Sequence, residues 1–252
     1  MASNDLIVGG WHSITLALER APGDCLELWI GEREDTPEVE NILALAMRHG
    51  VAVGRVAQKT LTRLLGDEHH QGIVLRRRRP TLVELGALLD TFDGAENDPR
   101  VPLLLMLDHI QDPRNFGACL RVADGAGVDA VIFPRARSAP ISSAMAKTAS
   151  GALDTVAMVC VPNLAAAMRE LKRRRIWITG TDDEAEQSIY EVDFRGGSCI
   201  VVGNEGDGIR RLTRDQCDFL ASIPMSGQLS SLNVATACAV TLYEARRQRL
   251  SE

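Results

Sequence analysis

The chain has 252 residues, of which 45% are hydrophobic and 25% are charged, so it can bury the core of one large domain or two smaller ones. A net charge of −6 excludes nonspecific attraction of the whole molecule to a polyanion, and a nucleic-acid partner would need a local basic surface. The sequence shows no signal-peptide pattern, no apolar run near the ~18 residues of a membrane helix, and no metal-ligand spacing. Its six cysteines form no C-x-x-C pair. We therefore expect a cytoplasmic protein with reduced cysteines, no membrane segment and no metal.

Residues 1–80 predict a small α/β domain. Short apolar runs indicate strands, and apolar residues spaced three or four apart indicate helices. The predicted strands are 26–30, 51–56 and 72–75, and the predicted helices are 38–49 and 58–65. This segment is also basic, and such a stretch is either a solvated surface or a nucleic-acid contact. The basic residues are Arg48, Arg55, Lys59, Arg63 and the run from Arg76 to Arg79.

Residues 81–100 predict a linker. A short amphipathic stretch at 82–89 precedes Asp-Gly-Ala-Glu-Asn-Asp-Pro, a composition typical of loops. We place the domain boundary here, with a second domain over residues 101–252.

Residues 101–252 alternate between apolar strands and helices. The predicted strands are 103–107, 130–133, 156–159, 176–179, 199–202 and 219–223, and the predicted helices are 115–126, 142–150, 164–174 and 231–247. This alternation favours a parallel sheet covered on both faces. Ligands of such sheets bind beyond the carboxyl ends of the strands, so the loops after residues 107, 179, 202 and 223 are candidates for the site.

The loop after residue 107 leads into a helix that we expect Asn115 to open. Asn is a favoured N-cap residue, and Arg121 lies about two turns inside the helix. Taken alone, either residue fits a cap or a solvated arginine as well as a functional role.

The loop after residue 202 reads Gly-Asn-Glu-Gly-Asp-Gly. Its glycines permit positive φ angles and a tight turn that exposes Glu205. The G-x-x-G-x-G spacing differs from the dinucleotide fingerprint G-x-G-x-x-G. The glycines at 125 and 127 follow a helix and precede a strand, the reverse of a Rossmann phosphate loop. A Rossmann-type nucleotide-dependent enzyme therefore stays an alternative with little support.

The loop after residue 223 contains Ser231, a natural N-cap for the last predicted helix. Helix N-termini present free N–H groups that suit an anion or a polar ligand. Asn233 stands two residues past the expected cap, where an asparagine is a mediocre helix former without a capping role.

Together, three blocks resemble the SpoU, or TrmH, branch of the SPOUT RNA methyltransferases, over nearly all of residues 101–247. They are Asp112-Pro113-x-Asn115-x-Gly117-x-x-x-Arg121, Val202-Gly203-Asn204-Glu205-Gly206-x-Gly208, and Ile223-Pro224-Met225 through Ser231-Leu232-Asn233-Val234. Residues 147–152 match less strongly. In the first domain, Gly10-Trp11-His12 and His70-Gln71-Gly72 resemble the substrate-binding domain of one subgroup, which has a ribosomal-protein-like RNA-binding fold.

The resemblance implies an S-adenosylmethionine-dependent enzyme with a C-terminal trefoil knot, which acts as a homodimer whose sites are completed at the interface. The subgroup implies 2′-O-methylation of a guanosine ribose in the P loop of 23S ribosomal RNA, with RNA selectivity in the N-terminal domain. Two alternatives stay open: the same chemistry on tRNA, and a non-catalytic RNA-binding protein that retains the fold.

The resemblance also implies the site residues. It places cofactor contacts at the backbone of Gly203, Ile223 and Leu232, with Met225 as an apolar wall. The polar active-site positions are Asn115, Arg121, Glu205, Ser231 and Asn233. A free arginine is protonated and cannot act as a base, so we expect Arg121 to hold an RNA phosphate and position the ribose.

Overall fold

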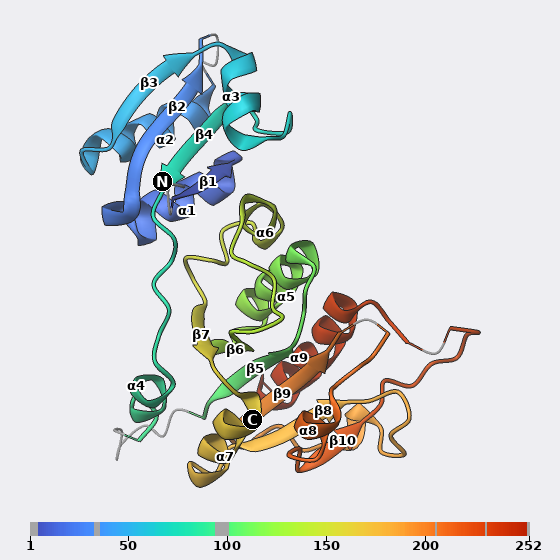
Figure 1. The fold of residues 1–252 in the computed structure, drawn as a ribbon. Coiled ribbons are helices and arrows are strands. Elements are labelled where there is room, and N and C mark those ends of the chain that lie inside the picture. The colour runs from blue at the N-terminus through green and yellow to red at the C-terminus, as the bar shows by residue number, and fades with distance from the viewer. Residues whose placement is uncertain (1–4, 33–35, 94–100, 205, 230, 251–252) are drawn as a thin grey trace. The chain divides into compact units, whose positions relative to one another are not determined.

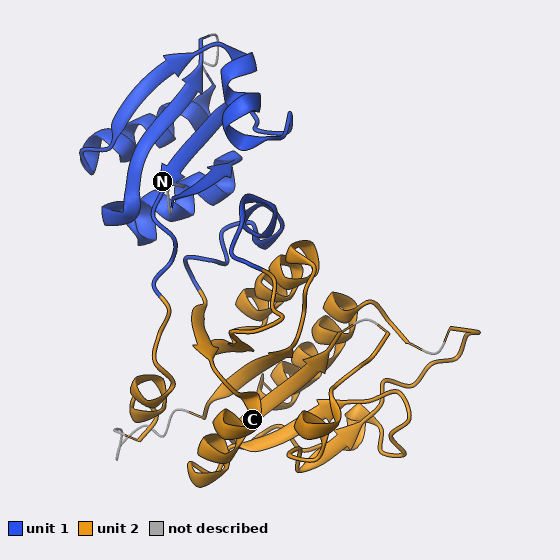
Figure 2. Cartoon of the chain, viewed as in Figure 1, with its two compact units in different colours: residues 1–81, 140–155 blue, residues 82–139, 156–252 orange. Residues whose placement is uncertain are grey.

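The computed structural model describes residues 5–32, 36–93, 101–204, 206–229 and 231–250. It divides into two compact units (Figure 2). Unit 1 comprises residues 1–81 and 140–155, and unit 2 comprises residues 82–139 and 156–252. The chain therefore passes between the units three times, after residues 81, 139 and 155.

Unit 1 is built on a four-stranded mixed sheet in the order β1-β4-β2-β3 (Figure 1). The strands are β1 (Leu6–Gly9), β2 (Cys25–Gly31), β3 (Ala52–Val56) and β4 (Ile73–Arg77). β4 runs antiparallel to β1 and β2, whereas β2 and β3 are parallel. The helices are α1 (Trp11–Arg20), α2 (Pro37–Arg48), α3 (Gln58–Leu65) and α6 (Ser143–Ala149), with a short 3-10 helix η1 (Pro22–Asp24).

The predicted elements of the first domain appear in the structure with ends shifted by a few residues at most, whereas β1 and α1 were not predicted. The signal for α1 was present in the sequence. Ile14, Ala17 and Leu18 have the three-to-four spacing of a buried helix face, and all three are buried.

Unit 2 contains a six-stranded sheet in the order β10-β8-β9-β5-β6-β7, and every neighbouring pair is parallel. This confirms the predicted parallel sheet. The strands are β5 (Leu103–Asp108), β6 (Ala130–Pro134), β7 (Ala157–Val161), β8 (Trp177–Thr181), β9 (Ser198–Gly203) and β10 (Phe219–Ala221). The helices are α4 (Leu85–Asp90), α5 (Pro113–Ala126), α7 (Leu164–Arg173), α8 (Arg211–Arg214), α9 (Val234–Leu250) and the 3-10 helix η2 (Ile189–Glu191).

Helices cover both faces of the unit 2 sheet, as the continuous apolar strands require (Figure 1). On one face α5 and α9 pack together, and the rings of Phe116 on α5 and Phe133 on β6 meet edge to face, with centroids 5.1 Å apart. On the other face, α4 and α7 bury their leucines against alternate strand residues such as Leu104 and Ile132. Within the described residues, no helix is both long enough and apolar enough to cross a membrane.

Two predicted helix starts were wrong. α5 begins at Pro113, because the Asp112 side chain accepts a hydrogen bond from the Arg114 backbone and proline suits the first helical position. Asn115 therefore lies in the first turn and does not cap the helix. α9 begins at Val234, so Ser231 lies outside it.

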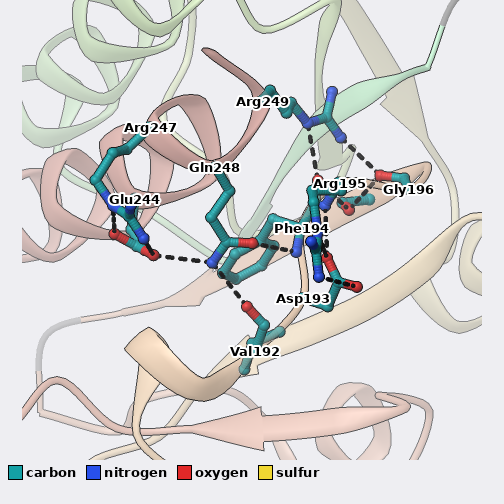
Figure 3. Close-up of polar contacts among 10 residues, drawn as sticks. Val192, Asp193, Phe194, Arg195, Gly196, Glu244, Arg247, Gln248 and Arg249 are labelled. Carbon is teal, nitrogen blue, oxygen red and sulfur yellow. Dashed lines mark hydrogen bonds and ion pairs between the residues drawn. The ribbon is translucent and has the colours of Figure 1, made fainter. Parts of the chain in front are cut away.

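The carboxyl end of α9 is tied to the chain between η2 and β9 (Figure 3). Arg249 donates to the backbone oxygens of Phe194 at 2.9 Å and Gly196 at 2.8 Å, and also to Val101 and Pro102, both at 3.0 Å. These four bonds fix the end of the last helix to the chain segments that lead into β5 and β9.

Candidate functional site

A cavity of about 500 Å³ lies where β8, β9 and β10 end. Its wall comes from residues 181–184 at the end of β8, from the end of β9 and the glycine loop, and from residues between 223 and 237 after β10. All four expected cofactor residues line it, and so does Ser231. These four are Gly203, Ile223, Met225 and Leu232. Glu205 lies outside the described residues.

The glycine loop folds back on itself at the rim of this cavity. The backbone N–H of Asn204 donates to the Gly208 oxygen at 3.1 Å, and the Gly208 N–H donates to the Asn204 oxygen at 2.9 Å. Gly206 has a φ of +94°, a conformation that L side chains rarely adopt. A Cβ on Gly203 would lie 2.0 Å from the Gly208 carbonyl carbon. The close turn therefore requires glycine at position 203.

Asp182 and Arg214 form a polar part of the wall. Arg214 Nε lies 3.0 Å from Asp182 Oδ2, and the Asp182 side chain is only 10% exposed. The other oxygen, Oδ1, accepts the backbone N–H of Glu184 at 3.0 Å. Asp183, Glu184 and Asp207 add further carboxylates, and Arg214 is the one cationic residue among the described lining. The wall thus carries more negative than positive charge.

Asn115 and Asn233, from separate sequence blocks, are in contact. Asn233 Nδ2 donates to Asn115 Oδ1 at 3.2 Å. Asn233 also caps α9, because its Oδ1 accepts the Ala235 N–H at 3.0 Å and its backbone oxygen accepts the Ala237 N–H at 2.9 Å. The expectation that Asn233 has no capping role was wrong.

Arg121 lies on α5 about two turns from its start and is exposed. Within the described part of the chain its side chain makes no hydrogen bond or ion pair, and it does not line the cavity. The structure therefore brings Asn115 and Asn233 together, and gathers Ser231 with the cofactor candidates, but leaves Arg121 in solvent.

Asp108 is a buried carboxylate that the sequence analysis missed, and it supports the chain beside the candidate site. It ends β5, is fully buried, and accepts the backbone N–H of Arg210 at 2.8 Å through Oδ2. Its other oxygen contacts the His109 ring. This carboxylate links the loop after β5 to the chain that follows the glycine loop. An acid closing the apolar run Leu-Leu-Leu-Met-Leu was the available signal.

The two short motifs of unit 1 bind each other. Trp11 donates its backbone N–H to Gln71 Oε1 at 3.1 Å, and its Nε1 to the Gln71 oxygen at 2.9 Å. His70 is buried, accepts the Gly72 N–H at Nδ1 at 3.0 Å, and contacts Thr62 Oγ1 through Nε2 at 3.2 Å. These residues join the start of α1 to the turn before β4, so their role here is to build the domain.

The basic residues of unit 1 fall into two groups: some are exposed to solvent, and others are held in ion pairs. Arg48, Lys59 and Arg63 are exposed. Arg76 pairs with Asp5 and Glu27, and Arg77 is only 1% exposed. The expectation of a continuous basic run at 76–79 was wrong for Arg77, which an ion pair removes from solvent. Among the described residues, no group of three His, Cys, Asp or Glu side chains is arranged to hold a metal.

Two family models match the chain. The model described as SpoU rRNA Methylase family matches residues 102–243. The model described as RNA 2'-O ribose methyltransferase substrate binding matches residues 7–82.

Three known proteins show how far the similarity extends. The 23S rRNA (guanosine-2'-O-)-methyltransferase RlmB of Ralstonia nicotianae is 43% identical over 250 residues, which cover 99% of this chain and 98% of that protein. The SpoU methyltransferase AviRb from Streptomyces viridochromogenes, solved in complex with the cofactor AdoMet, has a TM-score of 0.80 at 26% identity and covers 99% of this chain and 92% of its own. The A. aeolicus TrmH/SpoU tRNA modifying enzyme has a TM-score of 0.54 at 30% identity and covers 66% of this chain and 83% of its own.

The methylase model matches more than half of the chain, and the relative from Ralstonia nicotianae matches nearly all of it. The chain therefore belongs to the SpoU rRNA methylase family.

Proposed function

We propose that this protein transfers the methyl group of S-adenosylmethionine to the 2′-hydroxyl of a guanosine ribose in 23S ribosomal RNA. The observation that carries the proposal is the convergence of Gly203, Ile223, Met225 and Leu232 on one cavity at the carboxyl ends of the parallel strands. The full-length similarity to an enzyme named for this reaction supports it.

The cavity fits this cofactor. About 500 Å³ lies within the ~300–1,000 Å³ range of small-molecule sites. The backbone at Gly203 and Gly208 can approach an adenosine closely because no side chain intervenes, and Met225 and Leu232 offer apolar surface. The carboxylates of the wall suit a ligand that carries an ammonium and a sulfonium.

The protein must meet two chemical requirements of the reaction, alignment of the reacting atoms and removal of a proton. S-adenosylmethionine supplies an activated methyl group on a good leaving group, and that chemistry needs no metal. The protein must align the weakly nucleophilic 2′-hydroxyl with the methyl carbon and assist the loss of its proton. We assign this work to Arg121, Asn115, Glu205, Ser231 and Asn233. Arg121 holds an RNA phosphate with its forked donors and does not act as the base.

The extent of similarity favours ribosomal RNA over tRNA. The relative named for 23S rRNA matches 99% of this chain, whereas the tRNA modifying enzyme covers 66%. Residues 7–82 match a substrate-binding model, which supports a separate RNA-recognition role for the N-terminal domain. Within 23S rRNA we propose the P loop as the target.

We further propose a trefoil knot in unit 2, a homodimer and a cytoplasmic location. The shared cavity of the glycine loop and the 223–237 segment supports the knot, because such a knot brings these two stretches together. Exposed Tyr243 on α9, with 52% of its surface free, supports a partner surface on that helix. Ribosomal RNA as the substrate supports the cytoplasm.

The proposal is tested by 2′-O-methyl mapping of rRNA and tRNA from cells with and without the gene, and by methylation of unmodified 23S rRNA with the purified protein. We expect one guanosine to lose its mark in the absence of the gene, and the purified protein to restore it with a chelator present. Unchanged methylation of rRNA together with a lost tRNA mark would overturn the assignment of the substrate.

A further inference from the structure

Residues 140–155 lie inside the stretch matched by the methylase model but pack with the substrate-binding unit (Figure 2). This segment carries α6 and connects β6 to β7 of unit 2. α6 packs beside β1 in unit 1. A part of the methyltransferase sequence is therefore built into the N-terminal unit.

A buried ion pair holds this segment. Arg77 Nη1, at the end of β4, lies 2.6 Å from Asp154 Oδ2, and their side chains are 1% and 4% exposed. Arg77 Nε also donates to the Arg78 backbone oxygen at 3.2 Å, which fixes the direction of the guanidinium. Both charges are shielded from water, so each depends on the other for compensation.

Close packing surrounds the pair. Gly151 has a φ of +98°, and a Cβ there would lie 2.2 Å from Leu16 Cδ1 on α1, so the segment approaches α1 more closely than any side chain permits. Lys147 on α6 pairs with Asp67 at 2.5 Å, with 48% and 34% of these side chains exposed. An exposed pair of this kind contributes little, so of the two ion pairs the buried one costs more to break.

We propose that Arg77 and Asp154 are positioning residues for the RNA substrate. They fasten residues 140–155 to the substrate-binding domain, so this domain is attached to unit 2 through three passages of chain and not through the passage after residue 81 alone. RNA bound by the domain then has fewer orientations available to it, which raises the fraction of bound RNA in reactive geometry at the methyl-transfer site. This inference rests on the proposed RNA methylation.

The test uses four variants of the full chain. Asp154→Asn and Arg77→Met each leave one buried group uncompensated and should release the segment. The double variant Arg77→Met with Asp154→Leu replaces the pair by apolar groups and should keep the segment attached, because such replacements of buried pairs are often tolerated. Arg76→Met is the matched control, since Arg76 is the preceding residue of β4 and its pairs are partly exposed.

Three quantities are measured for each variant: hydrogen exchange of residues 143–149, affinities for S-adenosylmethionine and 23S rRNA, and single-turnover methylation rate. For the two single variants we expect faster exchange in α6, unchanged affinities, and a methylation rate lowered ~10-fold or more by poorer positioning. The double variant and Arg76→Met should resemble wild type in all three. Recovery in the double variant distinguishes positioning from simple destabilisation.

Two results would overturn the inference. One is normal methylation by a single variant whose α6 exchanges freely, and the other is full protection of α6 in both single variants. If wild-type protein binds S-adenosylmethionine but methylates neither rRNA nor tRNA, the proposed function fails instead, and the exchange data alone still report whether the pair holds the segment.

Discussion

Asn233 donates a side-chain hydrogen bond to Asn115 at 3.2 Å, although 118 positions separate them in the sequence. The bond joins the first turn of α5 to the cap of α9, the two helices that pack on one face of the parallel sheet. Two polar groups expected at the active site are therefore fixed relative to each other by the same residue that starts the last helix.

This double role can be separated by substitution. Asn233→Asp keeps a good N-cap but cannot donate to the Asn115 oxygen, so we expect near-normal stability with impaired methyl transfer. Asn233→Ala should lose both functions and about 1 kcal/mol of stability. Thermal unfolding and single-turnover methylation measure the two effects. Full activity of Asn233→Asp would show that methyl transfer does not need the hydrogen bond between Asn233 and Asn115.

Arg121 should matter to catalysis and not to folding. It is exposed on α5, so Arg121→Ala should fold and bind S-adenosylmethionine normally, while methyl transfer falls by ~10²–10³. Arg121→Lys keeps the charge but loses the fork, and should also be badly impaired. Arg173→Ala, which changes another exposed arginine on α7, is the control and should leave methyl transfer unchanged. An unfolded or fully active Arg121→Ala protein would require a new assignment of the site.

Gly203 should tolerate no side chain. A Cβ there would lie 2.0 Å from the Gly208 carbonyl carbon, so Gly203→Ala must open the loop that lines the cavity. We expect affinity for S-adenosylmethionine, measured by calorimetry, to fall more than ~10-fold, because binding depends on a preformed site. Gly86→Ala on α4 meets no atom within 4 Å and should leave binding unchanged. Equal affinities for the two variants would show that the glycine loop does not hold the cofactor.

The exposed cations of unit 1 should set the salt dependence of RNA binding. Replacing Arg48, Lys59 and Arg63 by Gln removes charge without touching the ion pairs of Arg76 and Arg77. We expect weaker binding of 23S rRNA and a slope of log affinity against log salt that is shallower by ~0.7–0.9 for each phosphate that is no longer neutralised. The matched triple replacement of Arg173, Arg195 and Arg211 in unit 2 should leave the slope nearly unchanged. Identical slopes for both triple variants would place the RNA-binding surface elsewhere.

Glu244 should contribute to stability in a pH-dependent manner. Arg247 donates to both its carboxylate oxygens at 2.9 Å and Gln248 donates at 2.8 Å, and the hydrogen bonds from Arg247 lower the pKa of Glu244 below its ordinary value (Figure 3). A lowered pKa means that the stabilisation is present above the ordinary glutamate pKa and is lost as the pH falls through the lowered value. The Tm difference between wild type and Glu244→Gln should thus be largest at neutral pH and shrink in acid. Glu186→Gln, at an exposed position, should show no such trend.

The sequence predicted the regular elements well where apolar periodicity was strong. The parallel sheet of unit 2 followed from strands such as 103–107 and 199–202, whose side chains are buried on both faces. Helix starts were less accurate, because Asp112, Asn115, Ser231 and Asn233 are all residue types that cap helices well, and residue type alone does not decide between them.

Long-range pairings could not be predicted from the sequence. Nothing in the local pattern indicates that Asp154 pairs with Arg77, or that Asp108 accepts a bond from the chain after the glycine loop, because periodicity carries no information on residues far apart in sequence. The gathering of the cofactor candidates was predictable only as far as parallel strands place their carboxyl ends at one edge.

Unit 1 is discontinuous in the sequence, and this affects the order in which the protein can fold. During synthesis, the β1-β4-β2-β3 sheet is complete once residue 77 is made, but the Arg77 guanidinium lacks its carboxylate until Asp154 follows. By then β5 and β6 of the second unit have already been made. The N-terminal unit therefore acquires its last core residues only after the first strands of the parallel sheet have been translated. A fragment that ends at residue 81 would leave Arg77 without its counter-charge.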